Sequence, residues 1–452
     1  MATGGAAGPL KHGVRIVRNG ECVVDSGKGT TYIHVFGCRA SLSEGEFIAG
    51  MLKSYGHDIT EDLTREFSSA VIVTCSVTHE ADRKCRNLIR RVRKILGAEG
   101  VLAVCGCWAQ GVDANSARDL GVDILGGSKG KNLIPSAVIN MSEHGRKFLD
   151  LRTNDMSQWE ELPLTSTILH SRAFVKIQDG CNHFCTYCII PFLRGKPVSR
   201  PIENIIAEIN RLIDNGTKEI IFTGIHLGIY GKDIDTSLAD LIRKVSEIDG
   251  LKRLRLGSIE PFSLDDDLIN ALAECKAFCH HLHLPLQSGD DDILGRMRRG
   301  YTSSEFVKVC DNLREKISGD IHISSDILTG FPGESDTAFN NTLDVMKASG
   351  FGRVHVFPYS PRNGTIAAQM AGQISHSAKI ERVAKAISLG REMFRDYAQK
   401  FIGTEAEILI ERDNKGHTRN YIEASCSGND NEIVKAEVIR FDGNRLECLR
   451  RD

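Results

Sequence analysis

The sequence predicts an α/β protein built from three parts: an N-terminal doubly wound α/β domain, a central partial (β/α)6 barrel and a small C-terminal β-barrel. Three observations predict this fold class. Short apolar runs rich in β-branched residues alternate with helical stretches in the first third of the chain, as buried parallel strands do. A strand-plus-helix unit then repeats six times. The last ~50 residues read as short strands separated by turn-forming residues.

Composition narrows the class of protein. Hydrophobic residues make up 41% and charged residues 26% of the 452 residues, which indicates packed domains. No apolar stretch approaches the ~18 residues that cross a bilayer, and the N-terminus lacks the apolar core of a secretory signal. Fourteen cysteines without an export signal indicate a reducing, cytoplasmic compartment, and we expect no membrane association. The expected boundaries are a flexible leader over 1–30, an N-terminal domain over 31–141, a linker over 142–171, a barrel domain over 172–391 and a C-terminal domain over 392–452.

The N-terminal domain is predicted from strands at 32–36, 70–73, 101–104 and 122–125, with helices at 43–54 and 80–96. Cysteines follow the first three strands where each ends, namely Cys38, Cys75 and Cys107. Because the carboxyl ends of parallel strands share one edge of a sheet, we expect the three thiols to meet there. Three unrelated buried cysteines are the alternative. We favour three thiolates that hold an iron–sulfur cluster with one iron open.

The central barrel is predicted from strands at 173–178, 219–222, 253–256, 281–284, 322–328 and 353–357, with helices such as 202–215 and 304–317 between them. Polar residues or glycines follow every strand, and reactive groups of such barrels gather at this rim. The rim residues are the loop 181–188, Thr223, His226, Ser258, Glu260, Gln287, Asp326, Gly330, Gly333, Glu334 and Pro358.

The loop 181–188 carries Cys181, Cys185 and Cys188 in the spacing C-x3-C-x2-C. A structural zinc site is one alternative, but zinc prefers four ligands, usually as two separated pairs. A thiol-exchange site is another, but it would use only the last two cysteines. Three thiolates on one loop favour a second iron–sulfur cluster with an open iron.

Basic residues gather in two places although the net charge is −2. They are Arg83, Lys84, Arg86, Arg90, Arg91, Arg93 and Lys94 on one helical stretch, and Arg440, Arg445, Arg450 and Arg451 near the C-terminus. Such local basic faces suit a partner that is contacted at a few phosphates, although a solvated helix face is the simpler alternative. The C-terminal strands, expected at 405–411, 421–425, 432–441 and 445–449 after a helix from about residue 392, form either an RNA-binding barrel or a structural lid.

The cysteine loop, with Arg194-Gly195 and Ser199-Arg200-Pro201 after it, resembles radical S-adenosylmethionine enzymes. The cysteine-bearing front domain narrows the resemblance to the methylthiotransferases, and the C-terminal barrel resembles their RNA-gripping TRAM module. The resemblance implies two 4Fe-4S clusters and S-adenosylmethionine as cofactors. The cluster on Cys181, Cys185 and Cys188 would bind and cleave S-adenosylmethionine to a 5′-deoxyadenosyl radical. The front cluster would carry the sulfur that is methylated and transferred.

The resemblance also implies which rim residues lie near the cofactor. Residues near its methionyl and ribose groups would be Arg200, Thr223, Ser258, Glu260, Gln287 and Pro358, while Gly330, Gly333 and Glu334 would shape the loop around the adenine. Two departures from the family pattern, Ser41 and Val73, lie beside front-domain cysteines, whereas Glu44 keeps the expected spacing.

The substrate is implied by the residues after the second barrel strand. The stretch Gly224-Ile225-His226 resembles the branch that modifies N6-threonylcarbamoyladenosine at position 37 of tRNA, with His226 as a substrate contact or simply a rim histidine. Isopentenyladenosine in tRNA and a ribosomal-protein aspartate are the alternative substrates, and a non-catalytic iron–sulfur RNA-binding protein is a further alternative. The expected partners are a tRNA anticodon stem-loop and an electron donor such as flavodoxin or ferredoxin.

Overall fold

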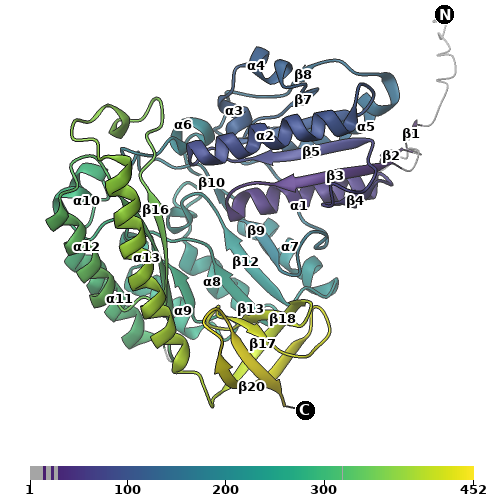
Figure 1. The fold of residues 1–452 in the computed structure, drawn as a ribbon. Helices are drawn as coiled ribbons and strands as arrows, with labels where there is room; N and C mark the ends of the chain where they lie inside the picture. Colours follow the sequence, from purple (N-terminus) through teal and green to yellow (C-terminus); the bar gives the residue numbers. More distant parts are fainter. Residues whose placement is uncertain (1–13, 17–21, 25–28, 318, 452) are drawn as a thin grey trace, which may run out of the picture.

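A computed structural model describes residues 14–16, 22–24, 29–317 and 319–451 (Figure 1). Within the predicted leader, β1 (Val14–Ile16) and β2 (Cys22–Val24) pair as an antiparallel ribbon. Residues 1–13, 17–21 and 25–28 of this leader lie outside the described residues. None of the helices described is both long and apolar enough to cross a membrane.

The N-terminal domain is a six-stranded parallel sheet with the order β4-β3-β5-β6-β7-β8. Its strands are β3 (Thr30–Val35), β4 (Asp58–Thr60), β5 (Ser69–Thr74), β6 (Val101–Gly106), β7 (Ile124–Leu125) and β8 (Leu149–Asp150). The four predicted strands are confirmed. Both outer strands, β4 and β8, were not predicted, because these short edge strands carry partly exposed residues and no buried apolar run.

Helices cover both faces of this sheet. Its helices are α1 (Arg39–Ser54), α2 (His79–Leu96), α3 (Cys107–Gly111), α4 (Ala114–Asp119), η1 (Lys131–Leu133) and α5 (Ile134–His144). Ile48 of α1 and Val138 of α5 pack in one hydrophobic core with Val71 of β5, whereas Ile89 of α2 packs in a separate core with Ile72. The domain is therefore doubly wound, and its strand order reverses between β3 and β5, where such sheets bind ligands.

The central domain is an open barrel of six parallel strands. They are β9 (Ala173–Lys176), β12 (Glu219–Thr223), β13 (Arg253–Leu256), β14 (His281–His283), β15 (His322–Thr329) and β16 (Arg353–Pro358). Two three-stranded sheets, β13-β12-β9 and β14-β15-β16, are joined by bridges between Leu254 and Phe278 and between Ser258 and His283. In the described structure no pairing closes the barrel between β9 and β16, which confirms the predicted partial barrel.

Helices form the outer layer of the barrel. They are α6 (Ile190–Arg194), α7 (Ile202–Asp214), η2 (Leu227–Ile229), α8 (Leu238–Ser246), η3 (Pro261–Ser263), α9 (Asp266–Glu274), α10 (Asp291–Met297), α11 (Ser303–Lys316), α12 (Asp336–Ala348) and η4 (Ala367–Gln369). A short ribbon, β10 (Gln178–Asp179) with β11 (Val198–Ser199), follows β9. The core that contains Ile48 of α1 also contains Val175 of β9, so the N-terminal domain packs on the barrel without a break.

The helix before the C-terminal barrel, α13 (His376–Gln399), begins well before the predicted start at about residue 392, because the Ser375 side chain caps its first turn. A closed barrel follows, in the order β17-β18-β19-β21-β20. Its strands are β17 (Glu405–Arg412), β18 (Lys415–Thr418), β19 (Glu423–Ser425), β20 (Ile433–Phe441) and β21 (Leu446–Arg450). No strand was predicted between 411 and 421, but a two-residue hairpin turn at Asp413 and Asn414, with φ 53° and 57°, leads directly into β18.

The C-terminal barrel closes the lower end of the central barrel. Arg253 and Arg255 of β13 donate hydrogen bonds to the Thr418 carbonyl at 2.9 and 2.7 Å, and both guanidinium groups also contact the buried Glu219 carboxylate. The Tyr421 ring enters among these arginines, 4.9 Å from the Arg255 guanidinium. The open rim at the opposite end therefore remains available for chemistry.

Candidate active site at the two cysteine sets

The front cysteines follow β3, β5 and β6 at the switch point of the sheet. Cys38 is the N-cap of α1, and Cys107 is the first residue of α3. Gly37 has φ 110°, and a Cβ at this position would lie 2.9 Å from the Cys75 Cβ, so only glycine permits this close approach. Burial raises the pKa of the Cys75 thiol to about 12, and the nearby Cys107 and Cys38 thiols raise it further. The role of the three thiols as ligands of one cluster stays a prediction.

Ser41, one of the two departures from the family pattern, keeps a contact with this set. Its Oγ lies 3.7 Å from the Cys38 Sγ. Beside the other departure, Val73, the Thr74 hydroxyl donates to the Cys105 carbonyl at 2.5 Å and accepts from the Ala109 N–H at 3.2 Å. A hydroxyl at or next to each departure, from Ser41 and from Thr74, therefore contacts the cysteine-bearing strand ends.

A buried charge network separates the front cysteines from the barrel. Arg194 Nε donates to the Cys107 Sγ at 3.1 Å, while its Nη1 contacts Glu44 at 2.9 Å and Asp179 at 3.1 Å. Lys176 Nζ bridges the same two carboxylates at 2.9 and 3.0 Å. Burial raises the pKa of Glu44, but Arg194, Lys131 and Lys176 outweigh it and hold this pKa far below its usual range.

This network carries excess positive charge toward the thiols. Four buried cations face two buried carboxylates, and Glu160 adds a third negative charge beside Lys129 and Lys176, so one positive charge is left unmatched. The cations are Lys129, Lys131, Lys176 and Arg194, and the carboxylates are Glu44 and Asp179. Buried charges persist only when they are compensated, so the surplus favours an anionic group held by the front cysteines. Thiolates that bind an iron–sulfur cluster fit this requirement.

The second cysteine set lies on the rim, in the loop after β10. Burial raises the pKa of the Cys181 thiol to about 11 and that of Cys188 to about 12, and the charge of Cys185 adds to both. Arg299 Nη1 donates to the Cys185 Sγ at 3.4 Å, and the His183 N–H donates to the Cys181 Sγ at 3.5 Å. Burial would raise the pKa of the Cys185 thiol, but the His183 ring and Arg299 lower it below its usual value.

Two histidines, one within this loop and one on the rim beside it, have ring nitrogens without a hydrogen-bond partner. His226 Nδ1 lies 3.7 Å from the Cys181 Sγ, and its backbone N–H donates to Gln178 Oε1 at 2.8 Å. The buried Nε2 atoms of His226 and His183 have no hydrogen-bond partner among the described residues. Across the same residues no three His, Cys, Asp or Glu side chains are arranged to hold a single metal ion. Three thiols, a guanidinium donor and unpaired imidazole nitrogens fit a cluster with a bound organic ligand.

Most residues predicted near the cofactor lie on this rim. Thr223 ends β12 and is buried, Ser258 follows β13 and is exposed, and Pro358 ends β16 and is exposed. Glu260 forms an ion pair with Arg299, which connects it to Cys185. Gln287 has φ 66° and bridges to Ile327 of β15.

Arg200 differs from the other predicted cofactor residues. Its guanidinium is buried against Glu208 of α7, at 2.6 Å, and against Glu161. The Arg200 side chain is thus paired with these two carboxylates, and its role in cofactor binding stays a prediction. The predicted adenine loop is shaped by Glu334, whose Oε2 accepts from the Gly330 N–H at 2.7 Å.

Sequence reasoning missed Arg299 and the lysines of the buried network. Arg299 lies in the stretch Arg298-Arg299-Gly300, which shows no pattern that separates it from surface arginines. Lys129 and Lys131 follow the last predicted strand of the front domain closely, so their place at the carboxyl edge was the available signal.

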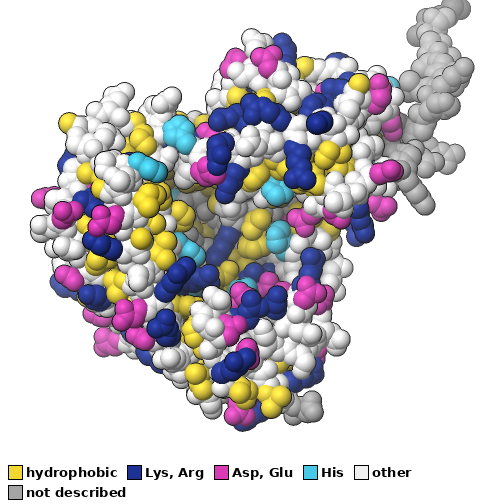
Figure 2. All heavy atoms as spheres, in the orientation of Figure 1, with side chains coloured by type: hydrophobic (Ala, Val, Ile, Leu, Met, Phe, Trp, Pro, Cys, Tyr) yellow, Lys and Arg dark blue, Asp and Glu magenta, His cyan; other side chains and the backbone are white. Residues whose placement is uncertain are grey.

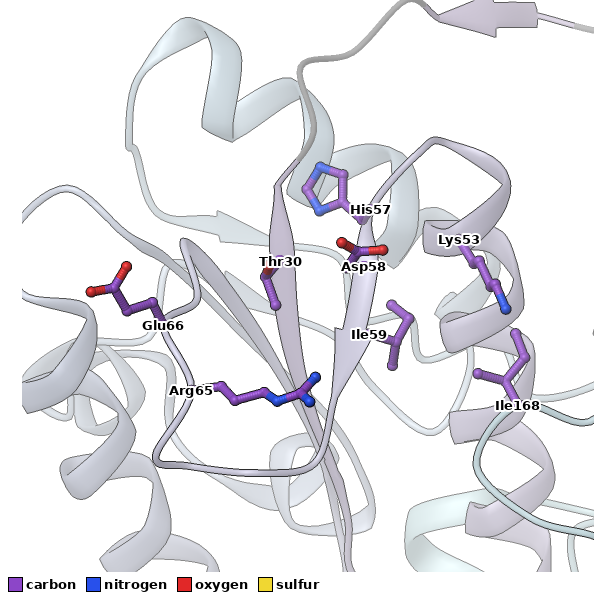
Figure 3. A pocket seen from close by; sticks show the side chains of 8 residues that line it. All are labelled: Thr30, Lys53, His57, Asp58, Ile59, Arg65, Glu66 and Ile168. Carbon is purple, nitrogen blue, oxygen red and sulfur yellow. The ribbon is translucent and has the colours of Figure 1, made fainter.

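A hollow of about 660 Å³ lies at the edge of the front sheet where the strands begin, opposite the edge that carries the cysteines (Figure 3). Thr30 and Asp58 in its lining are the first residues of β3 and β4, and His57 hydrogen-bonds Thr31 at 2.8 Å. Because ligands of open α/β sheets bind outside the carboxyl ends of the strands, this hollow lies at the wrong end for the chemistry.

Comparisons with known proteins agree with this geometry. Residues 175–346 match the Radical SAM superfamily, and residues 30–127 match the uncharacterized protein family UPF0004. The chain is 35% identical over 427 residues to threonylcarbamoyladenosine tRNA methylthiotransferase MtaB of Bacillus subtilis, covering 91% of this chain and 94% of that protein. It is 34% identical to tRNA-2-methylthio-N(6)-dimethylallyladenosine synthase of Aquifex aeolicus, over 93% of this chain and 99% of that protein. Its fold resembles the radical S-adenosylmethionine methyltransferase TsrM of Kitasatospora setae, with 15% identity, a TM-score of 0.52, and coverage of 74% and 77% of the two chains.

Proposed function

The chain belongs to the radical S-adenosylmethionine methylthiotransferase family, and on this basis we propose that it adds a methylthio group to C2 of N6-threonylcarbamoyladenosine at position 37 of tRNA. Enzymes of the radical S-adenosylmethionine superfamily use a 4Fe-4S cluster and S-adenosylmethionine. Relatives named for threonylcarbamoyladenosine and for dimethylallyladenosine match about equally well, so the substrate is argued from this chain's own residues.

Each cysteine set holds one 4Fe-4S cluster in this proposal. When bound, the barrel cluster with S-adenosylmethionine supplies a radical that abstracts hydrogen from the substrate, and the front cluster supplies the sulfur. Arg299 would hold the Cys185 side of the barrel site, because it already donates to that sulfur. Arg194 would do the same for Cys107, and its surplus positive neighbours offset the negative charge of the front site.

His226 carries the assignment of the substrate. Its Nε2 is buried on the rim and lacks a partner among the described residues, and such an atom costs free energy until a ligand satisfies it. A threonylcarbamoyl group offers carbonyl and carboxylate oxygens as acceptors and hydroxyl and N–H groups as donors, so it can satisfy this nitrogen in either tautomer of the ring. An isopentenyl group offers only carbon and would leave the nitrogen unpaired, so the polar substrate is favoured.

Nucleoside mass spectrometry of tRNA tests this proposal. Deletion of the gene should remove 2-methylthio-N6-threonylcarbamoyladenosine, and restoring the wild-type chain should return it. A His226→Phe chain should restore much less of this nucleoside, because it keeps a ring of similar size without the nitrogen. Loss of methylthiolated isopentenyladenosine instead would overturn the substrate assignment. Loss of a methylthiolated ribosomal-protein aspartate would overturn the choice of tRNA itself.

Two further parts of the proposal concern partners and place. A tRNA anticodon stem-loop is the macromolecular substrate, and a low-potential carrier such as flavodoxin or ferredoxin delivers the electron in the cytoplasm. Purified, reconstituted protein that is reduced but fails to cleave S-adenosylmethionine to 5′-deoxyadenosine would favour the non-catalytic RNA-binding alternative.

A further inference from the structure

A groove of about 900 Å³ runs along β16, the strand at the open edge of the barrel. One wall comes from α13, and the lower end comes from the C-terminal barrel, where Arg445 lines it. The upper end reaches Phe357, the residue before Pro358 on the rim. The groove therefore leads from the C-terminal barrel to the rim that carries the cysteine loop.

The groove wraps around the free edge of β16. Val354 packs toward α13, where a Cβ at Gly390 would lie 3.4 Å from the Val354 Cβ. The next residue, His355, faces the barrel interior, with its ring 6.0 Å from that of His283. Successive side chains of a strand alternate between its faces, so Arg353, His355 and Phe357 form one row toward the rim. Six residues of strand span about 20 Å, the scale of a short single strand rather than of a duplex.

The charge of the groove is strongly positive. Four arginines line it against one carboxylate, Glu423, which lies 3.4 Å from Arg445. The other three, Arg353, Arg391 and Arg395, are exposed, and none of them forms an ion pair within the described residues. Arg353 lies over the Phe394 ring at 5.7 Å instead.

Some basic residues elsewhere on the surface are neutralised by neighbours, whereas others, such as Arg86, Arg90 and Arg91 of α2, form no ion pair within the described residues. The other C-terminal arginines, Arg440, Arg450 and Arg451, pair with Glu447, Glu432 and Glu437 at 2.6 to 2.8 Å. On α2, Arg83 pairs with Glu80. Figure 2 shows basic side chains around the hollow between the upper domain and the barrel. Unpaired arginines that converge on one groove indicate a polyanion as occupant.

Exposed aromatic side chains also favour a nucleic acid as the occupant of the groove. The exposed phenylalanines of the described chain, Phe184, Phe192, Phe262 and Phe357, all lie in segments on the rim or beside the cysteine loop. Phe357 is 45% exposed at the upper end of the groove. Proteins that hold single-stranded nucleic acid combine cations along the backbone with aromatic rings on which bases stack.

We propose that this groove binds the single-stranded RNA segment next to the modified nucleotide, with Arg391, Arg395 and Arg445 on its phosphates and Phe357 stacked on a base at the rim. The proposal rests on the proposed function, because it takes tRNA to be the substrate. It adds the surface along which the RNA passes from the C-terminal barrel to the site. The arginine contacts to phosphates should weaken as salt rises, whereas stacking on Phe357 should not. Salt dependence therefore separates the two kinds of contact.

The test compares full-length chains for binding to a tRNA that carries N6-threonylcarbamoyladenosine, at several salt concentrations. Neutralising two phosphate contacts in Arg391→Gln/Arg395→Gln should reduce the slope of log affinity against log salt by about 1.4 and weaken binding at low salt about tenfold or more. Phe357→Ala should weaken binding about five- to one-hundredfold and leave the slope unchanged, because stacking releases no counterions. Lys385→Gln, on the same helix and paired with Glu381 at 2.8 Å, is the matched control and should bind as wild type does.

The possible outcomes separate this inference from the proposed function. If Arg391→Gln/Arg395→Gln binds tRNA as tightly as wild type with an unchanged salt slope, the groove is not the RNA-binding surface. The assignment of tRNA as substrate would still hold. An equal loss in Lys385→Gln would also overturn the groove as the RNA-binding surface, since the effect would then be general electrostatics. Wild-type protein that neither binds nor methylthiolates tRNA would instead overturn the proposed function.

Discussion

Arg194 Nε donates a hydrogen bond to the Cys107 Sγ at 3.1 Å, while its Nη1 contacts Asp179 at 3.1 Å. Asp179 precedes Cys181 by two residues, and its Oδ1 accepts from the Gly180 N–H at 2.9 Å. One buried guanidinium thus connects the front cysteines to the first cysteine of the barrel loop. The two sets, far apart in the sequence, share one polar core.

Replacing Arg194 should damage both the fold and the front site. Arg194→Met removes the hydrogen bonds that the buried guanidinium donates to Glu44, Asp179 and the Cys107 Sγ, and each such bond to a charged group contributes about 1.5–3 kcal/mol. We expect a lower Tm and less iron after reconstitution. Arg83→Met, which removes an exposed pair with Glu80, is the control and should change neither. Unchanged iron content in Arg194→Met would show that this arginine does not support the front site.

Gly37 should be intolerant of a side chain. Its φ is 110°, and an added Cβ would lie 2.9 Å from the Cys75 Cβ, so Gly37→Ala should displace Cys75 and lower the iron held by the front set. Cleavage of S-adenosylmethionine should persist, because the barrel loop is untouched. Gly97→Ala also has a positive φ but meets nothing within 4 Å, so it controls for backbone strain alone. Equal iron loss in both variants would refute the steric argument.

The contact between the barrels should be acid-sensitive. Burial raises the pKa of Glu219, but Arg255, Arg253 and Arg172 lower it more, to about 2 from an ordinary 4.5. The ionised carboxylate therefore contributes fully above pH 4.5, on the order of 3 kcal/mol, and this contribution is lost as pH falls toward 2. We expect Glu219→Gln to have a lower Tm than wild type at pH 7, and the difference to shrink by pH 3. A difference that stays constant across this range would contradict the assignment.

Tyr421 should hold the C-terminal barrel in place. Its ring faces the guanidinium groups of Arg255, Arg39 and Arg172 at 4.9, 5.6 and 5.6 Å. Tyr421→Ala should cost about 3–5 kcal/mol and weaken tRNA binding through loss of this packing. Tyr421→Phe keeps the ring but loses the hydrogen bond between the hydroxyl and Arg172, so it should lose clearly less thermal stability and tRNA affinity than Tyr421→Ala does. Similar losses in both variants would point to the hydroxyl instead of the ring.

Hydrophobic period and strand-end residues predicted the main architecture. The six barrel strands and the four predicted front strands lie within a few residues of their predicted positions, because all of them except the edge strand β16 are mostly buried runs. β18, with the sequence Lys-Gly-His-Thr, carries no such run and is held in register by the Asp413–Asn414 turn and its neighbours β17 and β19. β18 forms because neighbouring strands pair with it, and the local sequence pattern carries no signal of that pairing.

The cysteines were predictable from strand ends, whereas their supporting charges were not. Cys38, Cys75 and Cys107 follow predicted strands, so parallel topology alone places them together. Arg299 reaches Cys185 from a loop more than a hundred residues later, and Lys176 reaches Glu44 from another domain. Such contacts depend on how the domains pack. From sequence alone, a lysine or arginine is predicted to be a surface residue. The surplus charge at the front site became visible only in three dimensions.

Iron and sulfide content, measured with S-adenosylmethionine cleavage, tests the central claim that two cysteine sets hold two separate clusters. Reconstituted wild type should contain about eight irons per chain. Cys181→Ala/Cys185→Ala/Cys188→Ala should keep about half and produce no 5′-deoxyadenosine, whereas Cys38→Ala/Cys75→Ala/Cys107→Ala should keep about half and still produce it. Complete loss of iron in either triple variant, or cleavage that survives the first, would contradict the account.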